Sequence, residues 1–169
     1  AVLGSYSVGN PDLPVADRLA LIRLHGPMLE AIRRYQGYLG LHEYGNGDDA
    51  WNKWLLLRYR WWLLVDSKIR ILITECGMDG LHGTGASYRR SGLTPMQYAQ
   101  YLWRYELELR KDPQVIGATL FTYGADSGWA DYALSDAETD ALLWLNASWP
   151  ERLMTIARRI WMRNRPIPC

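Results

Sequence analysis

The chain has 169 residues, which is enough for one domain. Hydrophobic residues make up 49% and charged residues 22%, a composition that excludes a disordered protein. Its 19 Lys and Arg nearly balance its 18 Asp and Glu, for a net charge of +1, which excludes a nucleic-acid-binding protein with a basic surface. Nine Trp and eleven Tyr accompany a single Phe. These flat side chains with polar edges favour a surface that grips a sugar ring; a Trp-rich core is the alternative.

Targeting and cofactor signals are weak. No apolar run approaches the ~18 residues of a membrane span, and no signal peptide is evident, so we expect a cytoplasmic protein without membrane contact. Cys76 and Cys169 are too few for a disulfide framework and are expected to be free thiols. Phosphate-binding loops, zinc motifs and serine-hydrolase elbows are not found in the sequence, so we expect no cofactor and no metal.

Strand-like and helix-like segments alternate along the chain. Apolar, β-branched runs bounded by Gly, Pro and Asp predict strands, and Pro or Asp before apolar residues at helical spacing predicts helices. In chain order we expect a strand at 1–7, helices at 15–24 and 27–35, a strand at 38–44, a helix from near 50 to 62, a strand at 71–76, a helix at 95–111, a strand at 115–123, and helices at 136–145 and 150–163.

This order predicts an α/β fold of four βα units with parallel strands. Each predicted strand ends in polar or aromatic residues. They are Asn10, the His42–Tyr44 cluster, Glu75, and Tyr123 with Trp129. Because the carboxyl ends of parallel strands lie at one edge of a sheet, these residues are expected to form a site there.

Four segments resemble parts of a known enzyme family. They are SYSVGNP at 5–11, LHEYG at 41–45, ILITECG at 71–77, and IGATLFTY at 116–123 with Trp129 beyond it. Together they resemble the second half of a (β/α)8-barrel glycoside hydrolase, from the clan of retaining enzymes whose nucleophilic Glu ends the seventh strand. A complete barrel has about 250 residues. The resemblance therefore implies strands five to eight, a half-barrel that occupies residues 1–169 as a single domain with C-terminal helices.

The resemblance assigns the nucleophile to Glu75. Retaining hydrolysis needs a second carboxyl group ~5–5.5 Å away to protonate the leaving oxygen. The Asn-Glu pair that supplies it in this clan does not occur in the sequence, so the candidates are Glu43 or a residue of a second copy. Because side chains alternate along a strand, Glu43 is expected to point away from His42 and Tyr44. The alternative for Glu43 is a solvated carboxylate at the rim.

The remaining candidates would bind a carbohydrate substrate. The resemblance places His42 and Tyr44 beside the nucleophile, and Tyr123 and Trp129 as a platform under the sugar, for which packing at the rim is the alternative. Asn10 could bind a ligand hydroxyl, but Asn before Pro is also a common turn residue.

A half-barrel exposes two sheet edges and an apolar face, so we expect a homodimer that closes eight strands. The leading hypothesis is a retaining glycosidase. The alternatives are a non-catalytic carbohydrate-binding protein or truncated remnant of such an enzyme, and an enzyme that cleaves an ester at the same half-site.

Overall fold

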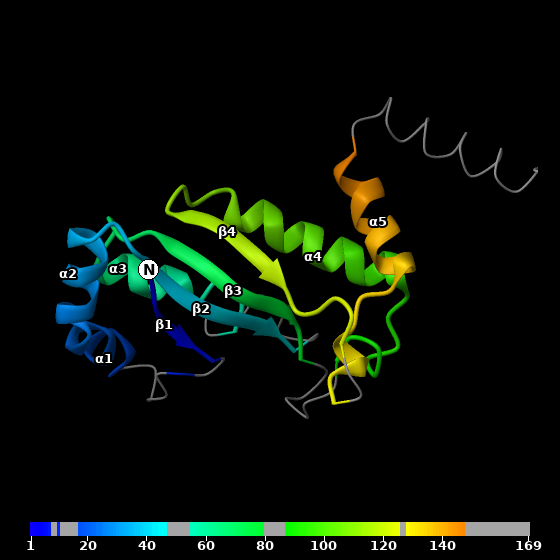
Figure 1. Ribbon diagram of the computed structural model, residues 1–169, viewed down its shortest axis with the longest axis horizontal. Coiled ribbons are helices and arrows are strands. Elements are labelled where there is room, and N and C mark those ends of the chain that lie inside the picture. The colour runs from blue at the N-terminus through cyan, green and yellow to red at the C-terminus, as the bar shows by residue number, and fades with distance from the viewer. Residues whose placement is uncertain (8–9, 11–16, 47–54, 80–86, 126–127, 148–169) are drawn as a thin grey trace, which may run out of the picture.

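The computed structural model of the protein describes residues 1–7, 10, 17–46, 55–79, 87–125 and 128–147. Its centre is a four-stranded sheet in the order β1-β2-β3-β4, in which every neighbouring pair is parallel (Figure 1). The strands are β1 Val2–Tyr6, β2 Tyr38–Gly45, β3 Ile71–Met78 and β4 Val115–Leu120. The predicted α/β fold with alternating βα units is thereby confirmed.

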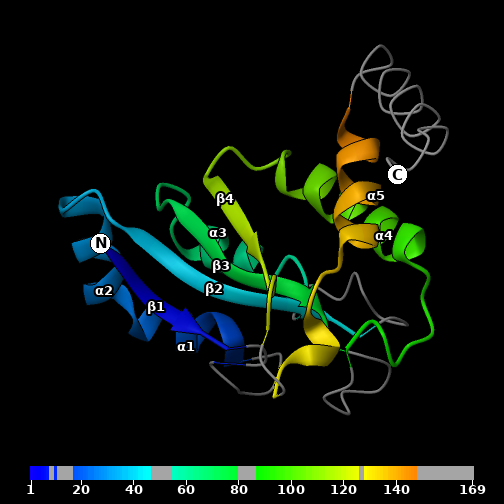
Figure 2. The ribbon, with the colours of Figure 1, turned by 45° about the vertical axis from the view of Figure 1, so that its right-hand side comes forward.

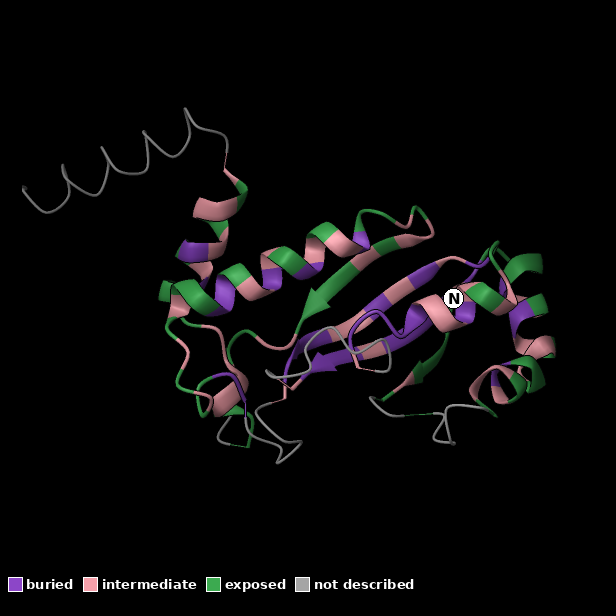
Figure 3. Cartoon of the chain, turned by 180° about the vertical axis from the view of Figure 1, so that it is seen from behind, coloured by how far each residue is buried: buried purple, intermediate pink, exposed green. Residues whose placement is uncertain are grey.

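The helices gather on one side of the sheet. They are α1 Arg18–Leu24, α2 Gly26–Arg34, α3 Tyr59–Val65, α4 Pro95–Leu109 and α5 Asp136–Asn146, with a short 3-10 helix at Ala130–Tyr132. In Figure 1, α3 and α4 pass behind the strands, and Figure 3 shows them in front when the molecule is seen from behind. Figure 2 shows α5 packed on α4 beside β4. We call the covered side the helix face and the other side the open face.

Two helices begin at the predicted residues 95 and 136, and each follows a capping residue. The Gln97 N–H donates to Thr94 Oγ1 at 3.3 Å, and the Thr94 N–H donates back to Gln97 Oε1 at 2.9 Å, which starts α4 at Pro95. Ser135 and Glu138 form the same reciprocal pair at the start of α5. The predicted helix at 150–163 lies outside the described residues.

The helix expected from near residue 50 begins later than predicted. Residues 47–54 lie outside the described part of the chain, residues 55–58 form a turn, and α3 starts at Tyr59. In this turn Leu57 has a φ of 63°, and the N–H groups of Leu57 and Tyr59 each donate to the Glu43 carboxylate at 2.9 Å. A buried carboxylate therefore fixes the start of this helix in place of a local capping residue.

The last strand is also shorter than predicted. It ends at Leu120, because Thr122 pairs with the segment that leads into α5. The Thr122 N–H donates to the Tyr132 carbonyl at 3.3 Å, and the Leu134 N–H donates to the Thr122 carbonyl at 2.8 Å. This pairing folds the connection after β4 back over the carboxyl edge of the sheet.

The core lies between the helices and the two central strands, which are the most buried part of the sheet in Figure 3. Leu39 and Leu41 of β2 and Ile71 and Ile73 of β3 are fully buried there. Cys76 is a buried free thiol whose pKa is raised to about 12 by burial, and Cys169 lies outside the described residues. In the described part of the chain, no helix has both the length and the hydrophobicity needed to cross a membrane.

Candidate functional site

A β-bulge in β3 decides which way Glu75 points. Leu41 of β2 is paired with Ile73, but the next residue, His42, is paired with Glu75, so Thr74 is an extra residue. If β3 were regular and Thr74 were paired in its turn, Glu75 would share the helix face with Ile73, because side chains alternate along a strand. The extra residue reverses the alternation and brings Glu75 to the open face beside His42.

A second bulge lies in β1, on the other side of β2. Gly4 is paired with Gly40 and Tyr6 with Leu41, so Ser5 is the extra residue. Tyr6 packs on the helix face, where its ring stacks on Trp62 at 5.5 Å between centroids. Ser5 points to the open face: its Oγ lies 3.2 Å from His42 Nε2 and 3.3 Å from Thr74 Oγ1. The two bulge residues thus meet across β2.

The Glu75 carboxylate is held through one oxygen. Tyr44 Oη donates to Glu75 Oε2 at 3.0 Å, and His42 Nδ1 lies 3.3 Å from the same oxygen. Burial, followed by the nearby Glu75 charge, raises the pKa of Tyr44 far above its ordinary value, so Tyr44 remains a hydrogen-bond donor. The Glu75 side chain is 35% exposed, so its carboxylate is both oriented and accessible.

This carboxylate lines a cavity of about 660 Å³ at the carboxyl edge of the sheet. The polar lining includes His42, Glu75, Asp79, Arg90 and Asp131. Tyr132 Oη donates to Asp79 Oδ1, and burial together with this bond raises the pKa of Tyr132. Arg90 is paired with Asp131 at 2.6 Å. The cavity therefore offers several hydrogen-bonding groups, some with positive and some with negative charge.

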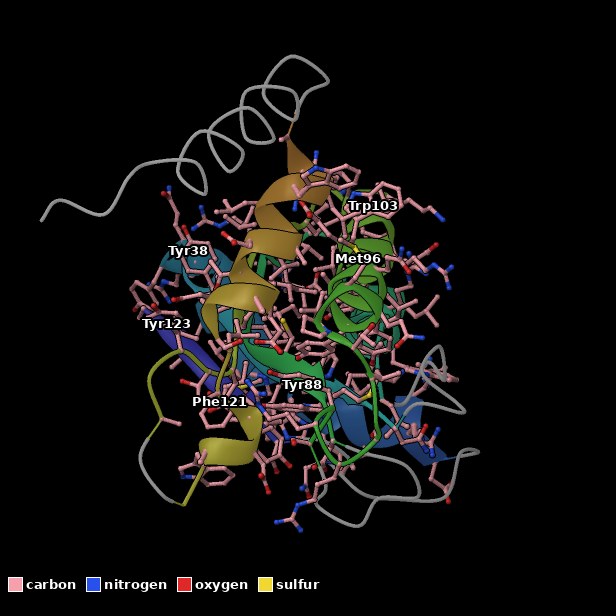
Figure 4. The ribbon with its side chains drawn as sticks, turned by 90° about the vertical axis from the view of Figure 1, so that its right-hand side faces the viewer. Tyr38, Tyr88, Met96, Trp103, Phe121 and Tyr123 are labelled. Atoms are coloured by element: carbon pink, nitrogen blue, oxygen red, sulfur yellow. The ribbon has the colours of Figure 1, made fainter. Side chains whose placement is uncertain are left out.

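Aromatic rings form the other wall of the cavity. The Trp129 ring meets Phe121 edge to face at 5.3 Å and Tyr132 at 5.7 Å between centroids. Trp129 remains 53% exposed, so part of its ring is available to a ligand. Phe121 is labelled in Figure 4 next to the loop that carries these rings. Such a platform beside polar groups suits a flat, hydroxylated ligand.

Glu43 has no access to this cavity. It is completely buried on the helix face, where Leu57 N–H, Tyr59 N–H and Tyr105 Oη donate to its carboxylate. Burial raises the pKa of Glu43, and these hydrogen bonds and the Arg58 charge oppose that rise without cancelling it. The expectation that Glu43 points away from His42 is confirmed. The alternative of a solvated rim carboxylate is wrong because Glu43 is buried, and the catalytic role expected for Glu43 as acid/base has no support in this geometry.

Asn10 and Tyr123 also lie outside the set of residues that line the cavity. Asn10 Nδ2 donates to Ser7 Oγ at 2.9 Å, so this side chain stabilises the turn in which it lies. Tyr123 is 69% exposed and lies at the periphery in Figure 4. The structure thus brings together Glu75, His42 and Tyr44 with Trp129, and leaves the other candidates apart.

Sequence reasoning missed several residues of the cavity and its neighbourhood, namely Ser5, Asp79, Tyr132 and the Arg90–Asp131 pair. Asp79 follows β3 directly, so its position at a strand end was a usable signal. Ser5 could not be found in this way, because its orientation depends on the bulge.

Within the described ranges, no group of three or more His, Cys, Asp or Glu side chains is placed to hold a metal ion. Comparison of the chain with protein-family models, with curated proteins and with solved structures finds no match.

Proposed function

We propose that the protein is a retaining glycoside hydrolase in which Glu75 is the nucleophile. The observation that carries the proposal is the Glu75 carboxylate itself, which is oriented through Oε2 by Tyr44 and His42 in a cavity walled by Trp129. A nucleophilic carboxylate must be ionised, fixed and exposed on the side of the sugar. The sugar ring would stack on Trp129 while its hydroxyl groups bind the polar lining.

The proposed reaction proceeds in two steps. Glu75 attacks the anomeric carbon and forms a glycosyl ester, while a carboxylic acid protonates the departing oxygen; water then cleaves the ester with the same acid acting as base. Glu43 is too buried for that role. We assign it to Asp79, the carboxyl group that follows the same strand and lines the same cavity, or to a carboxyl group of a second copy.

A panel of nitrophenyl glycosides tests the proposal. We expect turnover of at least one member and release of the sugar with its anomeric configuration retained, as followed by proton NMR. A 2-deoxy-2-fluoro glycoside of the same sugar should leave a covalent adduct on Glu75, because the fluorine slows hydrolysis of the glycosyl ester more than it slows its formation. Inverted product, or an adduct on another residue, would contradict the mechanism.

We further propose that the four βα units are a half-barrel and that two copies close it. Consecutive strands are neighbours throughout the sheet, as in a barrel. Both edge strands expose apolar side chains, Val2 and Leu3 on β1 and Ile116 and Leu120 on β4. Parallel sheets are ordinarily covered on both faces, so pairing β4 of one copy with β1 of the other would bury these residues.

Light scattering after size-exclusion chromatography tests this assembly. We expect a mass of twice the chain's 19.5 kDa. Ile116→Asp should shift the protein to the monomer, because it places a charge in the paired edge. Leu64→Asp is the matched control, since Leu64 is an exposed apolar residue of α3, which lies behind the strands. A wild-type monomer at every concentration would overturn the proposal.

The second candidate function is carbohydrate binding without turnover, which the half-exposed Trp129 favours. In either case Trp129→Ala is expected to weaken carbohydrate binding by about fivefold or more, because the apolar contact with the sugar ring is lost. Tyr123→Ala is the control, since this tyrosine lies on the same connection but outside the cavity. Isothermal titration calorimetry with the best sugar of the panel makes the comparison, and equal losses in both variants would exclude the Trp129 platform.

A further inference from the structure

Three side chains on the open face form a continuous relay, in which the glycosidase proposal uses Glu75 and His42 but gives no role to Ser5. Ser5 Oγ lies 3.2 Å from His42 Nε2, and His42 Nδ1 lies 3.3 Å from Glu75 Oε2. A hydroxyl on one imidazole nitrogen and a carboxylate on the other is the arrangement that activates a serine nucleophile. We propose that the protein also hydrolyses carboxylic esters, with Ser5 as nucleophile, His42 as general base and Glu75 as the group that orients His42.

The hydrogen bonds fix where the protons lie. The Glu75 carboxylate can only accept, so His42 Nδ1 carries the proton between them. In the neutral imidazole Nε2 is then an acceptor, and Ser5 must donate its hydroxyl proton to it. Thr74 Oγ1 lies 3.3 Å from both Ser5 Oγ and the Leu41 carbonyl, and its one proton can be donated to either. Ser5 is therefore in the state from which His42 can remove its proton.

The backbone around Ser5 is shaped for this placement. Ser5 has a φ of 49°, a left-handed conformation that a serine seldom adopts, and it is solvent-exposed at the bulge of β1. Such outliers are retained where the surrounding structure demands them, often at active sites. Gly40 makes room for it: a Cβ on Gly40 would lie 3.2 Å from the Ser5 nitrogen and 2.7 Å from Val2 Cγ1.

The reaction balances with these groups and water alone. Ser5 Oγ forms a bond to the ester carbonyl carbon as its proton passes to His42 Nε2. The C–O bond to the alcohol then breaks, and the alcohol leaves with that proton. Water attacks the acyl-serine, gives a proton to His42, and releases the acid while the proton returns to Ser5 Oγ. Because His42 and Ser7 line the cavity of Glu75, the fitting substrate is a short acyl ester of a hydroxylated alcohol that binds there.

Two probes test the relay in the full chain: hydrolysis of p-nitrophenyl acetate, and covalent labelling by an alkyl fluorophosphonate located by peptide mass spectrometry. We expect ester turnover and a single adduct on Ser5. Ser5→Ala should lower ester turnover by at least about 10³-fold and prevent labelling. Ser67→Ala, at an exposed serine between α3 and β3, should change neither. Circular dichroism confirms that each variant is folded.

A pair of glycine variants separates the relay from a general loss of stability. Gly40→Ala should lower ester turnover by moving Ser5 away from His42, whereas Gly117→Ala should not, because a Cβ there meets only Leu72 Cδ1 at 3.7 Å. Ester turnover that survives Ser5→Ala, an adduct on another residue, or a folded wild-type protein with neither turnover nor adduct would each overturn the proposal. Glycoside hydrolysis that survives Ser5→Ala shows that the two activities are separate; failure of the glycoside panel leaves this test intact.

Discussion

Glu75→Gln is expected to lower glycoside hydrolysis by at least about 10³-fold, because an amide cannot attack the anomeric carbon. The glutamine carbonyl can still accept from Tyr44, and the side chain is partly exposed, so we expect the free energy of unfolding to change by no more than about 1 kcal/mol. Initial rates on the best nitrophenyl glycoside and urea denaturation followed by circular dichroism measure the two quantities. Wild-type rates in a folded Glu75→Gln variant would rule out the nucleophile assignment.

A second carboxyl variant serves as the comparison for that experiment. If Asp79 is the proton donor, Asp79→Asn should slow hydrolysis of an alkyl glycoside much more than that of a nitrophenyl glycoside, whose good leaving group needs little protonation. Asp131→Asn is the matched control, because Asp131 lines the same cavity but is paired with Arg90. Equal slowing of both substrates by Asp79→Asn would instead favour a proton donor from a second copy.

Glu43→Ala is expected to lower the free energy of unfolding by about 3–5 kcal/mol. The substitution leaves the buried donors of Leu57, Tyr59 and Tyr105 without their acceptor. It also removes the negative charge that faces Arg58, whose pKa is lowered to about 10 by burial. Because the stability of a domain is only about 5–15 kcal/mol, the loss should be evident as a marked fall in the urea midpoint.

A surface carboxylate provides the control for Glu43. Glu106 pairs with Arg110 on the exposed side of α4, and Glu106→Ala should cost less than about 1 kcal/mol. Any Glu43→Ala protein that remains folded should keep much of its glycoside turnover, since Glu43 has no access to the cavity. A similar small loss of stability in both variants, or selective loss of turnover in folded Glu43→Ala, would contradict the structural role.

The elements of this fold could be predicted from local sequence because local interactions decide them. Thr94 and Ser135 mark the starts of α4 and α5, and the apolar runs around Ile71 and Val115 mark buried strands. The start of α3 could not be predicted, because Glu43, which fixes it, lies 14 and 16 residues away along the chain from the N–H groups that it binds. Contacts between residues so far apart along the chain leave no pattern in the local sequence.

The candidate site could be predicted only in part, because alternation within one strand is visible in the sequence and the register between strands is not. Alternation along β2 correctly separated His42 and Tyr44 from Glu43. Alternation along β3, taken alone, would have placed Glu75 on the helix face with Ile73. The register between strands corrects this, and register depends on pairing that a single strand does not encode.

The extra residue Thr74 has a consequence for how such a site tolerates change over evolutionary time. Because Thr74 lies as an extra residue between two paired positions, a deletion of one codon there would join Ile73 directly to the acidic residue, which would still be paired with His42 on the open face. Such a deletion would remove the Thr74 hydroxyl beside Ser5. The position of the acidic group is therefore compatible with two strand lengths, whereas straightening of β3 with Thr74 retained would turn it inward.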